Sequence, residues 1–297
     1  MTASRAPARF LLGQFLGRNA PAIDVVDVGA MQVPGVQPFY EPLYKSGVAR
    51  VVGFEPIEAE CAKLNAAARR NHTYLPYFIG DGREGTFYLT NTGYTSSLYE
   101  PNGPLVSRFN MLAEVMQVVR TSTVQTRKLD DVAEVANIDF LKADVQGSEL
   151  DLLRGATGKL STAVVVEVEV EFVALYKNQP LFAEVDQHMR AMGFSFHSFT
   201  GLAGRAFKPL TINNDPHGML RQVLWSDAIY VRDFMRLSEL TADQLLKLAV
   251  ILHDVYESSD LAALALQHYE AKGGKEIWKF FVQKLTGGVP VERPPLE

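Results

Sequence analysis

Acidic side chains follow apolar runs in this sequence, at places where they could act on a bound ligand. Asp144 comes directly after the apolar run 139–143, and a glycine and a helix-forming segment follow it. Such a run is typical of a buried strand, and ligands of open α/β folds bind where strands end. We therefore expect Asp144 to act as a base on a bound molecule.

Lys142 stands two residues before Asp144, so both side chains point to the same face of the expected strand. Its ammonium group could set the orientation or the pKa of the carboxylate, which makes Lys142 a second candidate for catalysis. A buried ion pair that only organises the turn explains the two residues equally well.

The stretch around Asp144 belongs to a longer pattern, in which Gly147 permits a turn and Glu149 begins a helix. This pattern resembles the FkbM family of S-adenosylmethionine-dependent methyltransferases. The segments that carry the resemblance are 129–131, 140–150, 153–156, 172–176, 179–182 and 227–232. Gln146 stands where that family usually has glutamate. The resemblance covers roughly residues 24–232 and implies a class I, Rossmann-like methyltransferase fold with S-adenosyl-L-methionine as the cofactor.

Three further acids stand at expected strand ends and follow one another at intervals of 28 and 26 residues: Asp27, Glu55 and Asp81. Because one βα unit is about thirty residues long, this spacing places them side by side at one edge of the sheet. We expect Glu55 to accept both ribose hydroxyls of S-adenosylmethionine and Asp81 to accept the adenine amino group. Pro56, which follows Glu55, belongs to the same expected cofactor site. A single acid at a turn is more often a solvated residue or a helix cap, so the recurrence carries the prediction.

The turn after the first expected strand would hold the methionine end of the cofactor. Asp27 and the backbone at Gly29 are its polar groups, and Ala30 is small enough to let a ligand come close. The turn lacks the second glycine of the usual G-x-G pattern.

Glu167, Glu169 and Glu171 alternate along one expected strand, which places them on one face at roughly 7 Å intervals. Such a ladder is repulsive in a region that should be buried. We expect Glu167 and Glu169 to line the acceptor pocket and Glu169 to take part in catalysis. Compensation by cations is the alternative, and Mg²⁺ and Ca²⁺ prefer oxygen ligands. Dependence on a divalent metal therefore stays open, and no metal ligand is assigned.

Two loops could recognise the acceptor. Ser96 and Ser97 lie in the hydroxyl-rich segment 91–104, and they match a hydroxyl patch in the family pattern. His217 lies in the long insertion before the last expected strand, which could reach the same pocket. Ordinary surface turns are the alternative interpretation for both loops.

These residues favour direct, in-line transfer of a methyl group to a hydroxyl of a sugar or a secondary metabolite. The expected partner is thus a small-molecule or glycan acceptor. A non-catalytic ligand-binding or assembly protein on the same fold is one alternative. An NAD-dependent dehydrogenase is more distant, because residues 29–35 do not fit the G-x-G-x-x-G fingerprint.

Composition excludes other classes of protein. The 297 residues carry a formal net charge of −5 without a dense Lys/Arg stripe, which argues against a nucleic-acid partner. No apolar run reaches eighteen residues, so we expect no membrane span. Cys61 is the only cysteine, which rules out a disulfide within the chain and favours a reducing, cytoplasmic location.

The elements that must position these residues are strands separated by helical patterns. We expect strands at 23–28, 51–56, 74–79, 139–143, 163–170, 193–199 and 227–232, and an extra hairpin around 85–90. This order predicts an α/β fold with a seven-stranded, mostly parallel, doubly wound sheet, whose last two strands are antiparallel, as the resemblance implies.

The chain divides into four expected parts. Residues 1–22 form an N-terminal helical segment, 23–235 the methyltransferase domain, 236–286 a C-terminal helical extension and 287–297 a disordered tail rich in proline and glycine. A capping box at 241–244 begins the first helix of the extension. These helices offer a surface through which copies of the chain could form a homo-oligomer.

Overall fold

The computed structural model describes residues 10–31, 35 and 37–296. Within them the chain forms two compact units. Residues 25–33 and 51–233 make up the first, which we call the sheet unit. Residues 1–24, 34–50 and 234–297 make up the second, which we call the helical unit. Residues 1–9 of the expected N-terminal helical segment lie outside the described part of the chain.

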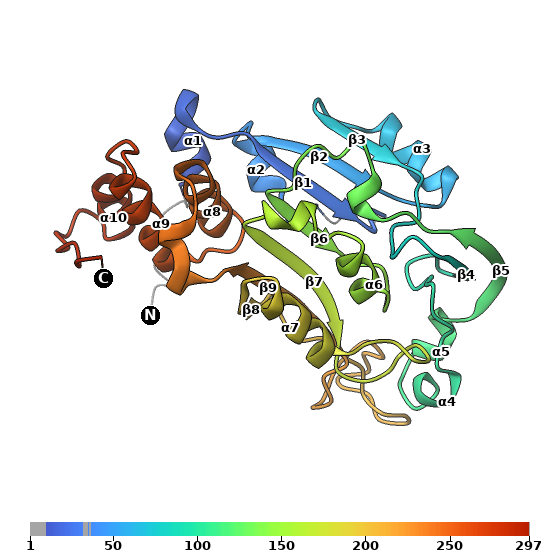
Figure 1. Cartoon of the computed structure of the whole chain (residues 1–297). Helices are drawn as coiled ribbons and strands as arrows, with labels where there is room; N and C mark the ends of the chain where they lie inside the picture. The colour runs from blue at the N-terminus through green and yellow to red at the C-terminus, as the bar shows by residue number, and fades with distance from the viewer. Residues whose placement is uncertain (1–9, 32–34, 36, 297) are drawn as a thin grey trace. The chain divides into compact units, whose positions relative to one another are not determined.

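Seven strands of the described residues form one sheet in the order β3-β2-β1-β6-β7-β9-β8 (Figure 1). They are β1 Ile23–Val28, β2 Ala49–Phe54, β3 His72–Leu75, β6 Phe140–Ala143, β7 Val165–Glu171, β8 Phe194–Phe199 and β9 Trp225–Arg232. The pairs β2/β3, β1/β6 and β6/β7 are parallel, whereas β9 is antiparallel to both β7 and β8. The predicted mostly parallel sheet with an antiparallel closing pair is confirmed.

Helices cover one face of this sheet through alternate strand residues. Val26, Leu141 and Val166 are partners in register, and their buried side chains belong to the main hydrophobic core. Helices α6 (Glu149–Arg154) and α7 (Phe182–Ala191) contribute leucines, a valine and a methionine to the same core.

Helix α3 (Glu58–Ala66) packs against the opposite face. Its buried Cys61 and Leu64 contact Tyr74, whose register partner in β2 is Gly53. A side chain at Gly53 would lie 2.4 Å from the Tyr74 ring, so glycine makes room for the aromatic residue. Helices on both faces confirm the predicted doubly wound architecture.

Two strands depart from the expected pattern. The third strand ends at Leu75, because Pro76 follows and cannot donate to a ladder; Ile79 forms only an isolated bridge to Arg127. Strand β4 (Glu84–Thr90) pairs with β5 (Val118–Gln125), which the sequence did not predict. Most side chains of β5 are exposed, so β5 lacks the apolar alternation that reveals a half-buried strand.

The remaining helical segments of the sheet unit are short, whereas the helical unit contains both short segments and the longer helices α8, α9 and α10. In the sheet unit they are α4 Gly103–Val106, α5 Leu112–Val115, η2 Leu129–Asp131 and η3 Lys159–Ser161. In the helical unit they are α1 Leu12–Leu16, η1 Gly17–Asn19, α2 Glu41–Lys45, η4 Phe234–Glu239, α8 Ala242–Asp254, α9 Ser259–Ala271 and α10 Trp278–Leu285. The predicted capping box is confirmed, since Thr241 Oγ1 accepts from the Gln244 N–H at 3.2 Å. None of the helices in the described ranges is long and apolar enough to cross a membrane.

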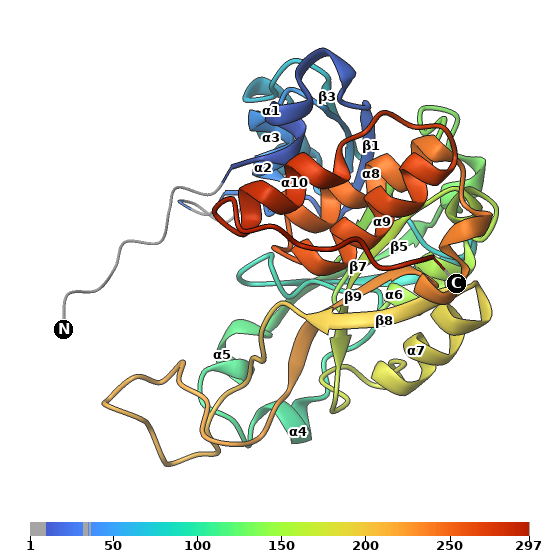
Figure 2. The ribbon, with the colours of Figure 1, turned by 90° about the vertical axis from the view of Figure 1, so that its left-hand side faces the viewer.

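A long connection separates the last two strands of the sheet unit. Figure 2 shows it in gold, extending beyond the ends of β8 and β9. It carries several exposed apolar side chains, among them Leu202, Phe207 and Leu210. The connection is anchored by Asn110, whose side chain donates to the Leu210 carbonyl at 2.6 Å.

Candidate active site

The carboxyl ends of β1, β2 and β6 border one cavity of about 240 Å³ in the sheet unit. Glu55 directly follows β2 and Asp144 directly follows β6, and both line this cavity. The two acids are thus brought together at one edge of the sheet. The apolar part of the wall includes five aromatic residues, Phe54, Tyr77, Phe78, Phe87 and Tyr94, beside aliphatic ones such as Ile57 and Ile79.

The turn after β1 depends on glycine. Gly29 has φ +84°, and a Cβ there would lie 1.8 Å from the carbonyl oxygen of Asp144. Gly29 and Met31 line the cavity. Ala30 is buried and packs with Cys61 and Tyr74 instead, so it is not among the lining residues.

Glu55 is almost completely buried, with 3% of its surface exposed. Its Oε1 accepts from the Ile57 N–H at 2.8 Å, which fixes the carboxyl group at the start of α3. Burial raises the pKa of Glu55 to about 7, although the backbone hydrogen bond opposes the rise. Pro56 and Ile57 line the cavity beside it.

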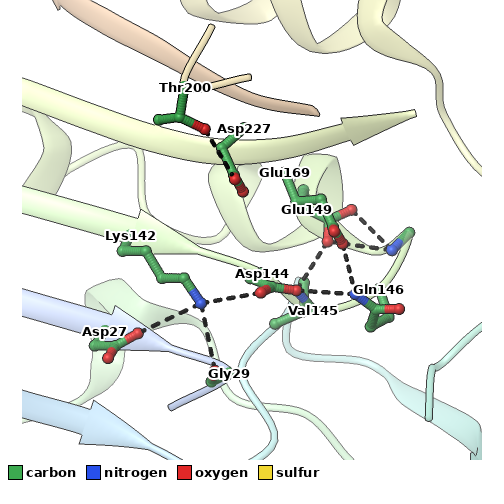
Figure 3. A network of polar contacts seen from close by, with 11 residues as sticks. Asp27, Gly29, Lys142, Asp144, Val145, Gln146, Glu149, Glu169, Thr200 and Asp227 are labelled. Atoms are coloured by element: carbon green, nitrogen blue, oxygen red, sulfur yellow. Dashed lines mark hydrogen bonds and ion pairs between the residues drawn. The ribbon is translucent and has the colours of Figure 1, made fainter. Parts of the chain in front are cut away.

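Lys142 ties the ends of β1 and β6 together (Figure 3). Its Nζ lies 3.1 Å from Asp144 Oδ2, 3.8 Å from Asp27 Oδ1 and 3.5 Å from the Gly29 carbonyl. Burial alone would lower the pKa of Lys142, but the two carboxylates outweigh it and raise that pKa. Lys142 therefore stays charged, and the expected ion pair is present.

Asp144 is the most exposed member of this group, with 31% of its side chain accessible. Burial would raise its pKa, but the Lys142 ammonium and a hydrogen bond from Gln146 outweigh burial and lower it. Asp144 is consequently ionised at neutral pH.

Glu149 closes the loop between β6 and α6. Its two carboxylate oxygens accept from the N–H groups of Val145 and Gly147 at 2.8 to 3.1 Å. Burial raises the pKa of Glu149 to about 7. One carboxylate oxygen from each of Glu149, Asp144 and Glu169 lies within 4.8 Å of the other two. These three residues form the centre of a carboxylate cluster at the loop after β6.

The glutamates of β7 are buried, as the sequence indicated. Glu169 accepts from Gln146 Nε2 at 2.6 Å, and burial together with the nearby Asp144 charge raises the pKa of Glu169 well above its usual range. Glu167 is 4% exposed and stands in register with Lys142. Neither glutamate lines the cavity of Glu55.

Ser96 and Ser97 both line the cavity. Ser96 Oγ accepts from the Thr90 N–H at 3.0 Å. Ser97 Oγ donates to the Gln146 carbonyl at 2.6 Å and accepts from the Tyr99 N–H at 2.9 Å. The loop after β4 is therefore bound to the loop after β6.

Asp81 and His217 lie apart from the cavity lining. Asp81 is paired with Arg83, whose side chain and backbone N–H both donate to it, and the Arg83 hydrogen bond lowers the pKa of Asp81. His217 is exposed in a turn where its N–H donates to Asp215 Oδ1 at 2.8 Å.

Asp227 was not singled out by the sequence, yet it belongs to the carboxylate cluster. It pairs with Glu169 in the antiparallel register of β7 and β9, and Thr200 Oγ1 donates to its Oδ2 at 3.2 Å (Figure 3). Burial, followed by the charge of Asp144, raises the pKa of Asp227. The alternation of residues within β9 indicates which face of the sheet Asp227 lies on, but not which residue of β7 it pairs with. Only the pairing of the two strands identifies Asp227 as a neighbour of Glu169.

Comparisons with known proteins give the family of the chain. The methyltransferase FkbM domain matches residues 27–196, whereas no curated protein matches the sequence. One similar solved structure is magnesium protoporphyrin IX methyltransferase from Synechocystis PCC 6803 with bound S-adenosylmethionine, at 13% identity and a TM-score of 0.36, with 74% of each chain covered. Another is LepI in complex with S-adenosylmethionine, at 9% identity and a TM-score of 0.34, with 78% of this chain and 50% of LepI covered. Because the domain match spans more than half of the sequence and includes the ends of β1, β2 and β6, the chain belongs to the FkbM methyltransferase family.

Proposed function

We propose that the chain binds S-adenosylmethionine in the cavity of the sheet unit and transfers its methyl group to a hydroxyl of a small-molecule or glycan acceptor. The observation that carries the proposal is that Glu55 and Asp144, at the ends of two parallel strands, line one cavity. Membership of the FkbM methyltransferase family supports the proposal, as does the general rule that ligands of open α/β sheets bind at the carboxyl ends of the strands.

The cavity wall suits each part of the cofactor. The Glu55 carboxylate accepts from the ribose hydroxyls, and aromatic residues such as Phe78 pack against the adenine ring. Gly29 lines the cavity at the end of β1, where the methionine end of the cofactor lies in this proposal. Asp81 is held by Arg83, so adenine recognition falls to the apolar wall in this proposal.

The charge of the site favours a cationic methyl donor. Asp27 and Asp144 supply two carboxylates for the single ammonium of Lys142 (Figure 3). A sulfonium group gains Coulomb energy beside these carboxylates. The same field disfavours anionic acceptors, so the acceptor is neutral or cationic.

Methyl transfer then needs alignment and a destination for one proton. The sulfur–carbon bond breaks as the carbon–oxygen bond forms, and S-adenosylhomocysteine leaves uncharged. The hydroxyl proton moves to Asp144. Although the pKa of Asp144 is lowered, a methylated oxygen that still carries its proton is a far stronger acid than any carboxylic acid, so Asp144 is basic enough.

Calorimetric titration with S-adenosylmethionine, combined with transfer of radiolabelled methyl groups into a metabolite extract, tests the proposal. We expect the chain to bind the cofactor and to label an uncharged, hydroxyl-bearing acceptor. Asp144→Asn keeps binding of S-adenosylhomocysteine, whose sulfur is uncharged, and loses labelling, whereas Asp243→Asn, an exposed change in α8, keeps both. A folded sample that does not bind S-adenosylmethionine would contradict the proposal.

A further inference from the structure

Gln146 connects three parts of the candidate site: the carboxylates of Asp144 and Glu169, the Tyr176 hydroxyl and the loop of Ser97. Its side-chain Nε2 donates to Asp144 Oδ1 at 3.0 Å and to Glu169 Oε2 at 2.6 Å (Figure 3). Both amide hydrogens are thus directed at carboxylates on two different strand ends. These two carboxylates would otherwise repel each other across the cluster.

The far end of the same amide is also bound. The Tyr176 hydroxyl lies 2.9 Å from Gln146 Oε1 and 3.0 Å from the Thr95 carbonyl. An ionised carboxylate only accepts hydrogen bonds and a hydroxyl can donate one, so the partners dictate which end of the amide faces which group. Glutamine satisfies this arrangement, whereas an ionised glutamate has no donor for Asp144.

The backbone of Gln146 adds a third connection. Its φ of +56° lies in the left-handed region, which is uncommon for a residue with a side chain. Its carbonyl accepts from Ser97 Oγ at 2.6 Å, and Ser97 lines the cofactor cavity. Gln146 also lines the cavity, so it couples the Ser97 loop to Asp144 in the same wall and to Glu169 outside the lining.

We propose that Gln146 is a positioning residue, which holds the Asp144 carboxylate toward the acceptor and joins it to Glu169 through a neutral amide. This inference rests on the proposed function. Two neighbouring carboxyl groups are commonly linked by a shared proton or a bound cation. Here the Gln146 amide links them by donating to both. In Gln146→Glu both N–H donors are lost and a further carboxylate joins the cluster. Only when the introduced carboxyl group is protonated can it donate a hydrogen bond to Asp144 or Glu169.

The groups that face Asp144 come from every neighbouring element. They are Lys142 on β6, Glu149 on α6, Glu169 and Glu171 on β7, Tyr176 after β7 and Asp227 on β9. Asp27 on β1 and Glu167 on β7 act on Lys142, the partner of Asp144. All of them are retained in variants of Gln146, so a change in pH dependence reports the lost amide link.

The first test compares Gln146→Glu, Gln146→Ala and the wild type in methyl transfer across pH. Hydrogen bonds to charged groups are strong, so we expect kcat to fall roughly 10- to 100-fold in Gln146→Ala. The cofactor dissociation constant should change by less than kcat, although Gln146 lines the cavity. In Gln146→Glu the loss is similar at pH 8 and smaller at pH 5, since the introduced carboxyl group can donate only when it is protonated. Gln187→Glu, an exposed change on α7, has the wild-type profile.

The second test reads Asp144 without turnover. In protein with ¹³C-labelled carboxyl groups, we expect the Asp144 pKa to be higher in Gln146→Ala than in the wild type, whatever the acceptor is. Wild-type rates and pH profiles in both variants, or an unchanged Asp144 titration, would overturn the inference. If the folded wild-type protein does not bind S-adenosylmethionine, the proposed function is overturned instead.

Discussion

The carbonyl oxygen of Asp144 lies 1.8 Å from the point that a Cβ atom on Gly29 would occupy. The Asp144 N–H also donates to the Val28 carbonyl at 3.0 Å, so the ends of β1 and β6 are in direct backbone contact. The two backbones cannot move apart without breaking this hydrogen bond between β1 and β6. The close approach allows the cofactor turn and the candidate base to border one cavity.

Gly29→Ala is predicted to destabilise the sheet unit by about 2 to 4 kcal/mol, because the new methyl group meets backbone at a positive φ. Urea-induced unfolding followed by circular dichroism measures the change. Gly103→Ala is the control, since nothing lies within 4 Å of its added Cβ and its φ is not positive. Equal stability of Gly29→Ala and the wild type would show that the turn can open.

Cofactor affinity is predicted to depend on pH through Glu55. Burial raises its pKa to about 7, so the ribose-accepting carboxylate is protonated in much of the free protein below that pH. We expect the dissociation constant of S-adenosylhomocysteine to rise about tenfold per pH unit below pH 7 and to level off above pH 8. Glu55→Gln binds more weakly and flattens this profile; a profile unchanged by the substitution would exclude Glu55 as the cause.

Lys142→Met is predicted to cost about 3 kcal/mol of stability at pH 7, because it leaves the carboxylates of Asp27 and Asp144 without their cation. In the wild type the lowered Asp144 pKa means that the ion pair stabilises the fold above the pKa of the unfolded chain and is lost only as pH falls through the still lower folded value. In the variant burial is no longer opposed by the ammonium and raises the Asp144 pKa, so the carboxyl group takes up a proton in mild acid and the destabilisation shrinks toward pH 4.

Denaturant titrations at pH 7 and pH 4 measure the effect of Lys142→Met. The control is Lys177→Met, which removes a half-exposed ion pair with Glu100 and should change stability by about 0.5 kcal/mol or less. A cost for Lys142→Met that is the same at both pH values would contradict the electrostatic explanation.

Glu149→Ala is predicted to destabilise the loop after β6 by about 2 to 4 kcal/mol, because the buried N–H groups of Val145 and Gly147 lose their acceptor. Glu149→Gln keeps one accepting oxygen and should cost less. Amide hydrogen exchange at residues 145 and 147 locates the effect, and Glu84→Ala, at an exposed position that begins β4, provides the control. Unchanged protection of both amides in Glu149→Ala would disprove the assignment.

The sequence by itself determined the strands and the acids at their ends. Apolar runs interrupted by acid and glycine predicted β1, β6 and β7, and the interval between Asp27 and Glu55 placed them on adjacent strands. These features depend on local pattern and on the length of a βα unit, both of which are readable along the chain.

Only the tertiary structure decided which of these acids meet. Asp81 obeys the same spacing as Glu55 but pairs with nearby Arg83, and Ala30 follows Gly29 but turns into the core under α3. Asp227 enters the cluster through the antiparallel register of β9. Long-range pairing and packing place each side chain on one face or the other, and that information is not local to the residue.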